Sequence, residues 1–276
     1  MKVFAVCTHA EGWYNALAIS AHRGGYNLIT IGWQQTWGGF VWRMSLILDA
    51  LETLNEDEII CFVDAYDVII LVPAIELRAR YTALVHDGRV LLAVENPLKE
   101  PLAYTLKRAV FGACVGGQTV NAGAYMGTVA MVRKFIVLIL NRAQETSQPN
   151  DQKVLNSLCR TLVKDELIAV DTEGDVFFHA VCASNRVSGV VHGYCLFGLG
   201  ANLENPLTGR RPAMLHAPGG LSLDRVCRRL DLPEGHVRKR MTWIVQNYKI
   251  ESVIFGGVLF IIVVVIICTL CNMKRA

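Results

Sequence analysis

Two aspartates three positions apart, Asp64 and Asp67, stand in the segment F-V-D-A-Y-D-V, residues 62–68. They follow the apolar run Ile59–Val63, which predicts a central strand covered on both faces. A carboxylate beside a buried strand costs free energy unless it is paired with a cation or binds a metal. Two carboxylates at one strand end can share a divalent metal, which can neutralise a diphosphate leaving group. Tyr66, between them, can stack on a nucleobase or ribose. The spacing alone also fits a helix cap.

The elements around these aspartates alternate between strands and helices, and the first three form a β-α-β unit. Open α/β sheets bind ligands at the carboxyl ends of their strands, so the aspartates lie where a site is expected. The expected elements are strands at 2–7, 27–33, 59–63 and 90–94, helices at 13–22, 41–54 and 133–144, a glycine-containing loop at 110–120, and a hairpin of 175–183 with 186–192.

Small and polar residues in the second half of the chain add to this pattern. The segment V-N-A-G-A-Y-M-G-T-V-A-M-V, residues 120–132, has small side chains that allow close backbone approach. Asn150 is expected to cap a helix that begins with Asp151 and Gln152. His216 is expected at the end of a late strand.

These segments resemble, in the same order, the motifs of the glycosyltransferase domain of procollagen lysyl hydroxylases and of its stand-alone viral relatives. The resemblance covers roughly residues 2–225, and six motifs in register make it far more specific than any one of them. The matching segments are Thr8–Trp13 for the family's T-x-x-x-E-G-Y, Trp37–Gly39 for W-x-G-G, Phe62–Val68 for F-V-D-S-Y-D-V, Val120–Gly127 for L-N-S-G-G-F-I-G, Asn150–Gln152 for D-D-D-Q, and Leu215–Gly219 for V-H-G-N-G.

The resemblance implies an α/β fold of the Rossmann-like GT-A type and transfer of galactose or glucose. It also implies a Mn²⁺ ion, UDP-galactose or UDP-glucose as donor, and a protein hydroxyl as acceptor, of the kind found in collagen hydroxylysine or its galactosyl derivative. The implied metal ligands are Asp64, Asp67 and His216; the implied donor-binding residues are Cys7, Thr8, Tyr66, Gly123, Trp37, Gly38 and Gly39; and the implied catalytic residues, facing sugar and acceptor, are Asp151, Gln152 and Asn121.

Three departures from the family pattern leave a second hypothesis open. Asn150 replaces a carboxylate, Ala217-Pro218 replaces Gly-Asn beside the histidine, and the lysine after the glycine loop is missing, with Arg43 a candidate substitute. The alternative is a catalytically silent, membrane-anchored scaffold with a transferase fold. A phosphohydrolase fits less well, because its motif needs D-x-D spacing. The chain has no H-x-D motif, so an iron-dependent hydroxylase site is not expected.

The end of the chain predicts a membrane anchor. Residues 253–271 are nineteen uncharged and mostly apolar residues, long enough to span a bilayer as a helix. We therefore expect a globular domain over 1–235, a basic juxtamembrane segment over 236–252, the span, and a short tail at 272–276. Basic residues are more numerous before the span than after it, and the chain has no Asn-x-Ser/Thr sequon. Both observations favour a tail-anchored protein whose domain faces the cytoplasm.

The composition limits the classes of binding partner and indicates the redox state of the cysteines. A net charge of +3 is too small to indicate nucleic acid binding, and a homo-oligomer stays open. Seven of the nine cysteines lie outside the span, and they are expected to be mostly reduced core residues.

Several other polar residues are interpreted as structural. Glu95, His179 and His192 are expected to be satisfied polar groups at strand ends, and the acidic turn at 171–175 is expected to be a solvated loop.

Overall fold

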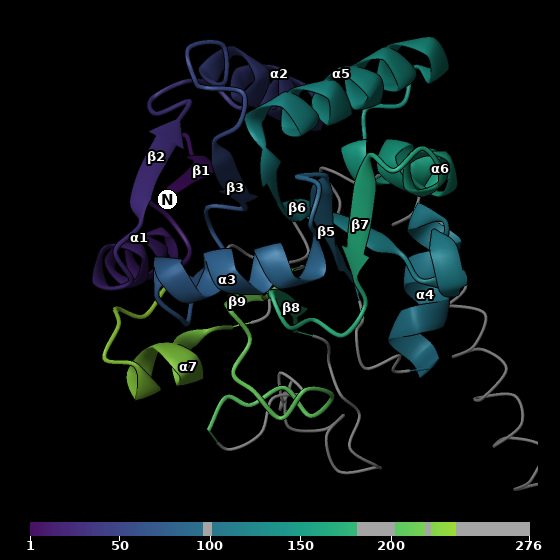
Figure 1. The fold of residues 1–276 in the computed structure, drawn as a ribbon. Helices are drawn as coiled ribbons and strands as arrows, with labels where there is room; N and C mark the ends of the chain where they lie inside the picture. Colours follow the sequence, from purple (N-terminus) through teal and green to yellow (C-terminus); the bar gives the residue numbers. More distant parts are fainter. Residues whose placement is uncertain (96–100, 181–201, 219–221, 236–276) are drawn as a thin grey trace, which may run out of the picture. The chain divides into compact units, whose positions relative to one another are not determined.

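A computed structural model of the chain describes residues 1–95, 101–180, 202–218 and 222–235. Its centre is a six-stranded sheet with the order β2-β1-β3-β6-β5-β7 (Figure 1). Paired strands are parallel except at β6, which runs antiparallel to both β3 and β5. The strands are β1 (Lys2–Val6), β2 (Asn27–Ile31), β3 (Ile59–Val63), β5 (Val90–Val94), β6 (Val120–Thr128) and β7 (Ile168–Asp171).

Helices cover both faces of this sheet, because the inner strands are apolar on both sides. In β1, Phe4 packs into the cluster under α2, α5 and α6, whereas Val3 packs into the cluster under α1 and α3. Helices α2 and α5 lie side by side over the first face (Figure 1). The helices are α1 (Tyr14–Arg23), α2 (Phe40–Ala50), α3 (Ala74–Leu84), α4 (Pro101–Phe111), the 3₁₀ turn η1 (Val115–Gly117), α5 (Val129–Thr146), α6 (Asp151–Lys164) and α7 (Asp224–Arg229).

A second sheet of three short strands has the order β4-β9-β8. Its strands are β4 (Val68–Ile70), β9 (Met214–His216) and β8 (Phe177–His179). Strand β9 is antiparallel to β4 and parallel to β8, and the register sets His216 opposite both Val68 and His179. A histidine late in the chain is therefore held beside the segment that follows β3.

The sequence placed several elements correctly and others wrongly. Strands β3 and β5 have the predicted bounds, and the Asn150 side chain caps α6 by accepting a hydrogen bond from the Lys153 N–H at 2.9 Å. Helix α2 ends at Ala50, four residues before the predicted end. The small-residue segment 120–132 is strand β6 followed by the start of α5, and the structure adds α3 and α4, which were not predicted. Small residues pack tightly between β3 and β5 but show no clear period, so their strand was missed.

Two predictions extend beyond the described residues. The juxtamembrane segment 236–252, the span 253–271 and the tail 272–276 lie outside them, as does the second arm of the predicted hairpin at 186–192. Strand β8, in the first arm, has β9 as its partner among the described strands. Within the described part of the chain, no helix combines the length and the apolar character that crossing a membrane requires.

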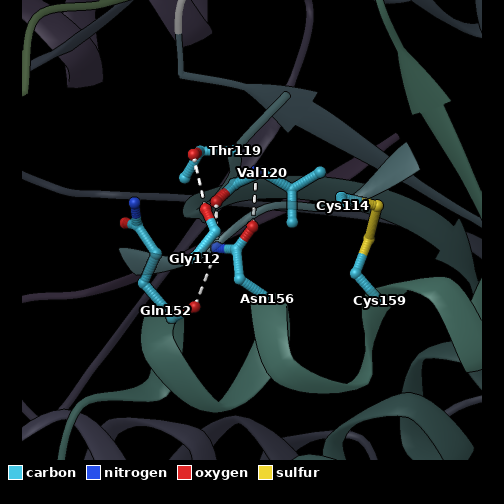
Figure 2. Close-up of a disulfide and its surroundings, with 7 residues drawn as sticks. All are labelled: Gly112, Cys114, Thr119, Val120, Gln152, Asn156 and Cys159. Carbon is cyan, nitrogen blue, oxygen red and sulfur yellow. Dashed lines mark hydrogen bonds between the residues drawn. A yellow bond between two sulfur atoms is a disulfide. The ribbon is translucent and has the colours of Figure 1, made fainter. Parts of the chain in front are cut away.

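One disulfide is an exception to the prediction that the cysteines are mostly reduced core residues. Cys114 and Cys159 are joined, with their Cα atoms 5.3 Å apart, while Cys7, Cys61 and Cys227 are free and buried as expected. Figure 2 shows that the bond links α6 to the loop before η1, close to Asn156 on the same helix. The Asn156 side chain both accepts from the Val120 N–H and donates to the Val120 carbonyl. Two hydrogen bonds thus fix the start of β6 to α6, and the disulfide fixes the loop before η1 to the same helix.

This bond predicts a measurable cross-link. Mass spectrometry of the denatured, unreduced protein should find the Cys114 and Cys159 peptides joined, and the double variant Cys114→Ser/Cys159→Ser should lose about 2–4 kcal/mol of unfolding free energy. A Cys61→Ser variant serves as the control that changes a buried, free thiol. Complete alkylation of both cysteines without a reductant would show that the disulfide does not form.

Candidate active site

The candidate site lies at one edge of the main sheet, where several chain segments end together. Asp64 follows β3 and Glu95 follows β5, both at carboxyl ends. Because β6 is antiparallel to these strands, its first residues, including Asn121, lie at the same edge. The amino terminus of α6 adds Asp151 and Gln152 to this cluster. Residues from four separate elements therefore lie together at the edge where the sequence predicted ligand binding.

Asp64, Asp67 and His216 come together here as a candidate metal site. Each offers one ligand atom, and these atoms lie within 4.8 Å of one another. The His216 Nε2 atom is 3.2 Å from Asp67 Oδ1 and 3.6 Å from Asp64 Oδ2. Among the described residues this buried nitrogen makes no well-formed hydrogen bond. An imidazole nitrogen and two carboxylate oxygens form a donor set suited to a divalent cation.

The backbone holds these three side chains in place. The Asp64 N–H donates to the Gly123 carbonyl at 2.7 Å, and the Ala217 N–H donates to the Asp67 carbonyl at 2.8 Å. Gly123 also keeps space open. A Cβ atom there would lie 2.3 Å from Asp64 Oδ2 and 2.7 Å from His216 Cε1. Only glycine fits at position 123 without displacing the two side chains.

Arg43, in the first turn of α2, connects two of the acidic residues. Its guanidinium donates to Asp64, to Asp151 at 2.5 Å, and to the Ala122 carbonyl at 3.3 Å. The side chain is buried; burial alone would lower its pKa, but Asp151 and Asp64 outweigh it and the pKa is raised. Gly39, at φ 96°, starts α2 in a backbone conformation that favours glycine, which places Arg43 at the edge. The expected substitute for the family's lysine is therefore an ion-paired arginine.

The charges at the site fit a divalent cation. One guanidinium stands against three carboxylates, Asp64, Asp67 and Asp151, so negative charge remains when His216 is neutral. Burial alone would lower the pKa of His216, but Asp67 and Asp64 outweigh it and the pKa is raised. The same carboxylates that attract a proton to this imidazole can attract a metal ion instead.

Glu95 organises the amide side chains on the other side of the cluster. Its Oε1 accepts hydrogen bonds from Asn121 Nδ2 at 2.7 Å and from Gln152 Nε2 at 2.6 Å, and its Oε2 pairs with Lys107 Nζ at 2.6 Å. Asn121 Oδ1 accepts from the Gly123 N–H at 2.6 Å. Both amides are thereby fixed in one orientation, next to the candidate metal site.

The predicted nucleotide-binding residues fall into two groups. Tyr66 lies beside Thr8, whose N–H donates to the tyrosine hydroxyl at 3.0 Å, and the Cys7 thiol donates to the His9 carbonyl at 3.1 Å. Thr8 and the fully buried Cys7 thus lie next to Tyr66, directly after β1. Trp37 is 42% exposed and packs edge-on against Phe40 and Trp42. No ring contact among the described residues joins the segment 37–39 to Tyr66.

Comparison with known proteins gives the family. The model of the PLOD GT domain matches residues 1–221. The chain belongs to the PLOD GT domain family. The PLOD GT match spans every segment named above as a candidate site, including Asp64, Asp67 and His216. The fold is accordingly an α/β GT-A glycosyltransferase fold, as the sequence predicted. A comparison with curated proteins found no match.

Three solved structures similar to this PLOD GT domain are distant from it in sequence. A crystal structure of the galactosyltransferase LgtC with donor and acceptor sugar analogues is 12% identical, covers 79% of this chain and 87% of its own, and has a TM-score of 0.46. A glycosyltransferase involved in glycosylation of the major capsid of PBCV-1 is 12% identical, covers 83% of this chain and 98% of its own, and has a TM-score of 0.48. The bifunctional WbbM enzyme is 12% identical, with a TM-score of 0.44, and covers 79% of this chain and 45% of its own.

Sequence reasoning placed two residues of this PLOD GT domain outside the site. Glu95 is satisfied, as expected, but it also binds two predicted catalytic amides. His179 packs against His216, and among the described residues its Nδ1 has no partner, so the expectation of a satisfied group was wrong. The signal available for Glu95 was its place directly after a strand, which it shares with Asp64.

The acidic turn at 171–175 is structural and only partly solvated: Glu173 is exposed as predicted, whereas Asp171 and Asp175 are buried. The buried Asp171 carboxylate accepts backbone hydrogen bonds from Asp175, Val176 and Phe177. Asp175 is also buried, and it pairs with Arg80 and Arg210. Hydrogen-bond donors and arginines thus satisfy these carboxylates.

Removal of Arg43 should destabilise the protein. Arg43→Met leaves Asp64 and Asp151 without their cation, and a broken buried pair costs about 3–5 kcal/mol. Urea unfolding in the presence of EDTA measures this loss, and Arg133→Met, at a 3.9 Å surface pair, should change stability by less than about 0.5 kcal/mol. Adding Asp151→Asn to Arg43→Met should recover part of the stability. Equal stability of Arg43→Met and wild type would contradict the ion-pair account.

Glu95 should give the protein a specific acid dependence. Burial would raise the pKa of Glu95, but Lys107 and the donated hydrogen bonds outweigh it and lower the pKa from 4.5 to about 2. A lowered carboxyl pKa stabilises the fold above the unfolded value and loses that contribution as the pH falls from about 4.5 towards 2. The unfolding free energies of wild type and Glu95→Gln should therefore converge by about 3 kcal/mol over this range. The exposed Glu145→Gln is the control, and a constant difference between wild type and Glu95→Gln would contradict this pKa.

Proposed function

We propose that this protein is a metal-dependent glycosyltransferase that moves galactose or glucose from a UDP-sugar onto a protein hydroxyl. The observation that carries the proposal is the convergence of Asp64, Asp67 and His216 around the space kept open by Gly123, in a chain of the PLOD GT domain family. Mn²⁺ is the cation the family implies. When bound, it supplies positive charge that stabilises the departing diphosphate.

The other residues bind and orient the donor and acceptor. Thr8, Tyr66 and the backbone at Cys7 form the surface for the uridine, and an aromatic ring such as Tyr66 can stack on a base. Asp151 and Gln152 face the sugar from the start of α6, and Asn121 lines the acceptor side. Because Glu95 and Arg43 fix these three side chains, their polar atoms are already oriented before substrate binds.

Asn150 no longer supports the scaffold alternative. It was, with the altered loop at Ala217-Pro218, one of the departures that favoured a catalytically silent protein, because it replaces a carboxylate of the family. Its side chain caps α6, and asparagine and aspartate serve equally well as helix caps. The carboxylate that reaches the site is Asp151, which bonds to Arg43. The substitution thus leaves the acidic group of the site in place.

The acceptor proposed here is of the collagen type. The Cys114–Cys159 disulfide supports folding in an oxidising compartment, where disulfides persist. Collagen-type substrates are also made in such a compartment, so the disulfide favours a lumenal domain over the cytoplasmic one inferred from the basic residues. Under this proposal the collagen-type acceptor and the glycosyltransferase domain are therefore in the same, lumenal compartment.

The proposal predicts metal-dependent nucleotide binding. In calorimetric titration of the full chain, UDP should bind with Mn²⁺ present and not in EDTA. Asp67→Asn should weaken Mn²⁺ binding by more than the roughly 10–100-fold that loss of an outer hydrogen-bond partner causes, because it removes a ligand itself. Asp57→Asn, in an exposed turn, should bind as wild type does.

Two outcomes would separate the hypotheses. Absence of UDP binding under every condition would contradict the donor site. UDP binding without Mn²⁺-dependent hydrolysis of UDP-galactose or UDP-glucose above an Asp64→Ala control would instead favour the scaffold.

A further inference from the structure

His179 is a buried histidine directly beside the candidate metal ligand His216. It ends β8, it is 0% exposed, and the parallel register of β8 and β9 sets the two residues opposite each other. The ring centroids lie 4.5 Å apart at 73°, and His179 Nε2 lies 3.3 Å from His216 Nδ1. The two imidazoles therefore meet edge to face through one pair of nitrogens.

The direction of this hydrogen bond follows from the chemistry of His216. Its Nε2 faces Asp64 and Asp67, so that nitrogen must be unprotonated when it binds a cation. The remaining ring proton is then on Nδ1, and the hydrogen-bond partner of that nitrogen is His179 Nε2. His179 Nε2 must accept a hydrogen bond from this N–H, which requires neutral His179 to carry its own proton on Nδ1.

We propose that His179 is a positioning residue that fixes the tautomer and the ring orientation of His216 for the metal. This role rests on the metal-dependent function proposed above. Partners of this kind, which accept a hydrogen bond from the second ring N–H of a ligating histidine, orient the ring and make it a better ligand. His179 would be a neutral acceptor, where a carboxylate or a carbonyl more commonly stands.

The surroundings of His179 support this role. The His179 ring is fully buried, and its Nε2 atom lies 3.3 Å from His216 Nδ1, so it is placed to accept a hydrogen bond from that nitrogen. The charged groups that act on His179 are Glu95 and Lys107, which have opposite signs. They form an ion pair with each other, with Lys107 Nζ 2.6 Å from Glu95 Oε2. A purely structural position in this apolar strand would suit phenylalanine, as at Phe177 and Phe178, and would leave no buried polar atom.

Two substitutions of His179 test the role through metal affinity. Gln offers an acceptor oxygen near the position of Nε2, whereas Phe keeps a ring and offers none. Titration of the full chain with Mn²⁺ alone should give a dissociation constant about 10–100-fold higher for His179→Phe and within about threefold of wild type for His179→Gln. Phe178→Leu, on the opposite face of β8, is the control for damage to the core.

The outcomes separate this inference from the function on which it rests. Equal Mn²⁺ affinity of His179→Phe and wild type would overturn the positioning role, as would equal losses in the Phe and Gln variants. A wild-type protein that does not bind Mn²⁺ would contradict the metal site itself, and the positioning role with it.

A measurement on the wild-type protein applies even where His179→Phe does not fold. Nitrogen-15 NMR of histidine-labelled protein loaded with diamagnetic Zn²⁺ reports the tautomer of each ring. His179 should carry its proton on Nδ1 and have an unprotonated Nε2. A proton on His179 Nε2 would show that it cannot accept from His216, and would overturn the proposal.

Discussion

The buried guanidinium of Arg43 is the interaction on which the active-site edge depends. It joins Asp64, after β3, to Asp151, at the start of α6, and its own position is set by the first turn of α2. Without a cation between them, two carboxylates could not be held so close together at the edge of a packed sheet. One ion-paired side chain of α2 therefore connects the end of β3 to the start of α6, and negative charge remains at this edge for a divalent cation.

The rest of the site depends on two further connections. The small sheet β4-β9-β8 carries His216 to the aspartates, because β9 pairs with the strand that directly follows Asp67. On the other side, Asn156 fixes the start of β6 to α6, where Asn121 bonds to Gln152, and the disulfide fixes the loop before η1 to the same helix. The small sheet thus holds the metal ligand His216, β6 and α6 hold the proposed sugar-facing residues, and Arg43 connects the two groups through Asp64 and Asp151.

The sequence predicted the parts of this arrangement that have a local signal. An unbroken apolar run marked β3, and the two aspartates after it marked the site, because carboxylates are costly at such a place. The resemblance added His216, which no local pattern could have linked to residues so far away in the chain. The residue type of Asn150 was enough to predict that it caps a helix, because asparagine is a preferred N-cap residue.

Other features depend on tertiary contacts and could not be read from the chain. Glu95 and His179 are ordinary polar residues after or within apolar strands, and only strand order shows what they contact. The pairing of Cys114 with Cys159 depends on how α6 packs against the loop before η1. Strand β6 was missed because its small residues matter for the space they leave, as Gly123 shows, and not for their hydrophobicity.

The central claim is that Asp64, Asp67 and His216 hold one divalent cation. Anomalous diffraction at the manganese edge, from crystals grown with Mn²⁺ and UDP, tests it most directly. The account predicts a single strong peak within coordination distance of all three side chains. A peak elsewhere, or no peak at this cluster while UDP is bound, would contradict it.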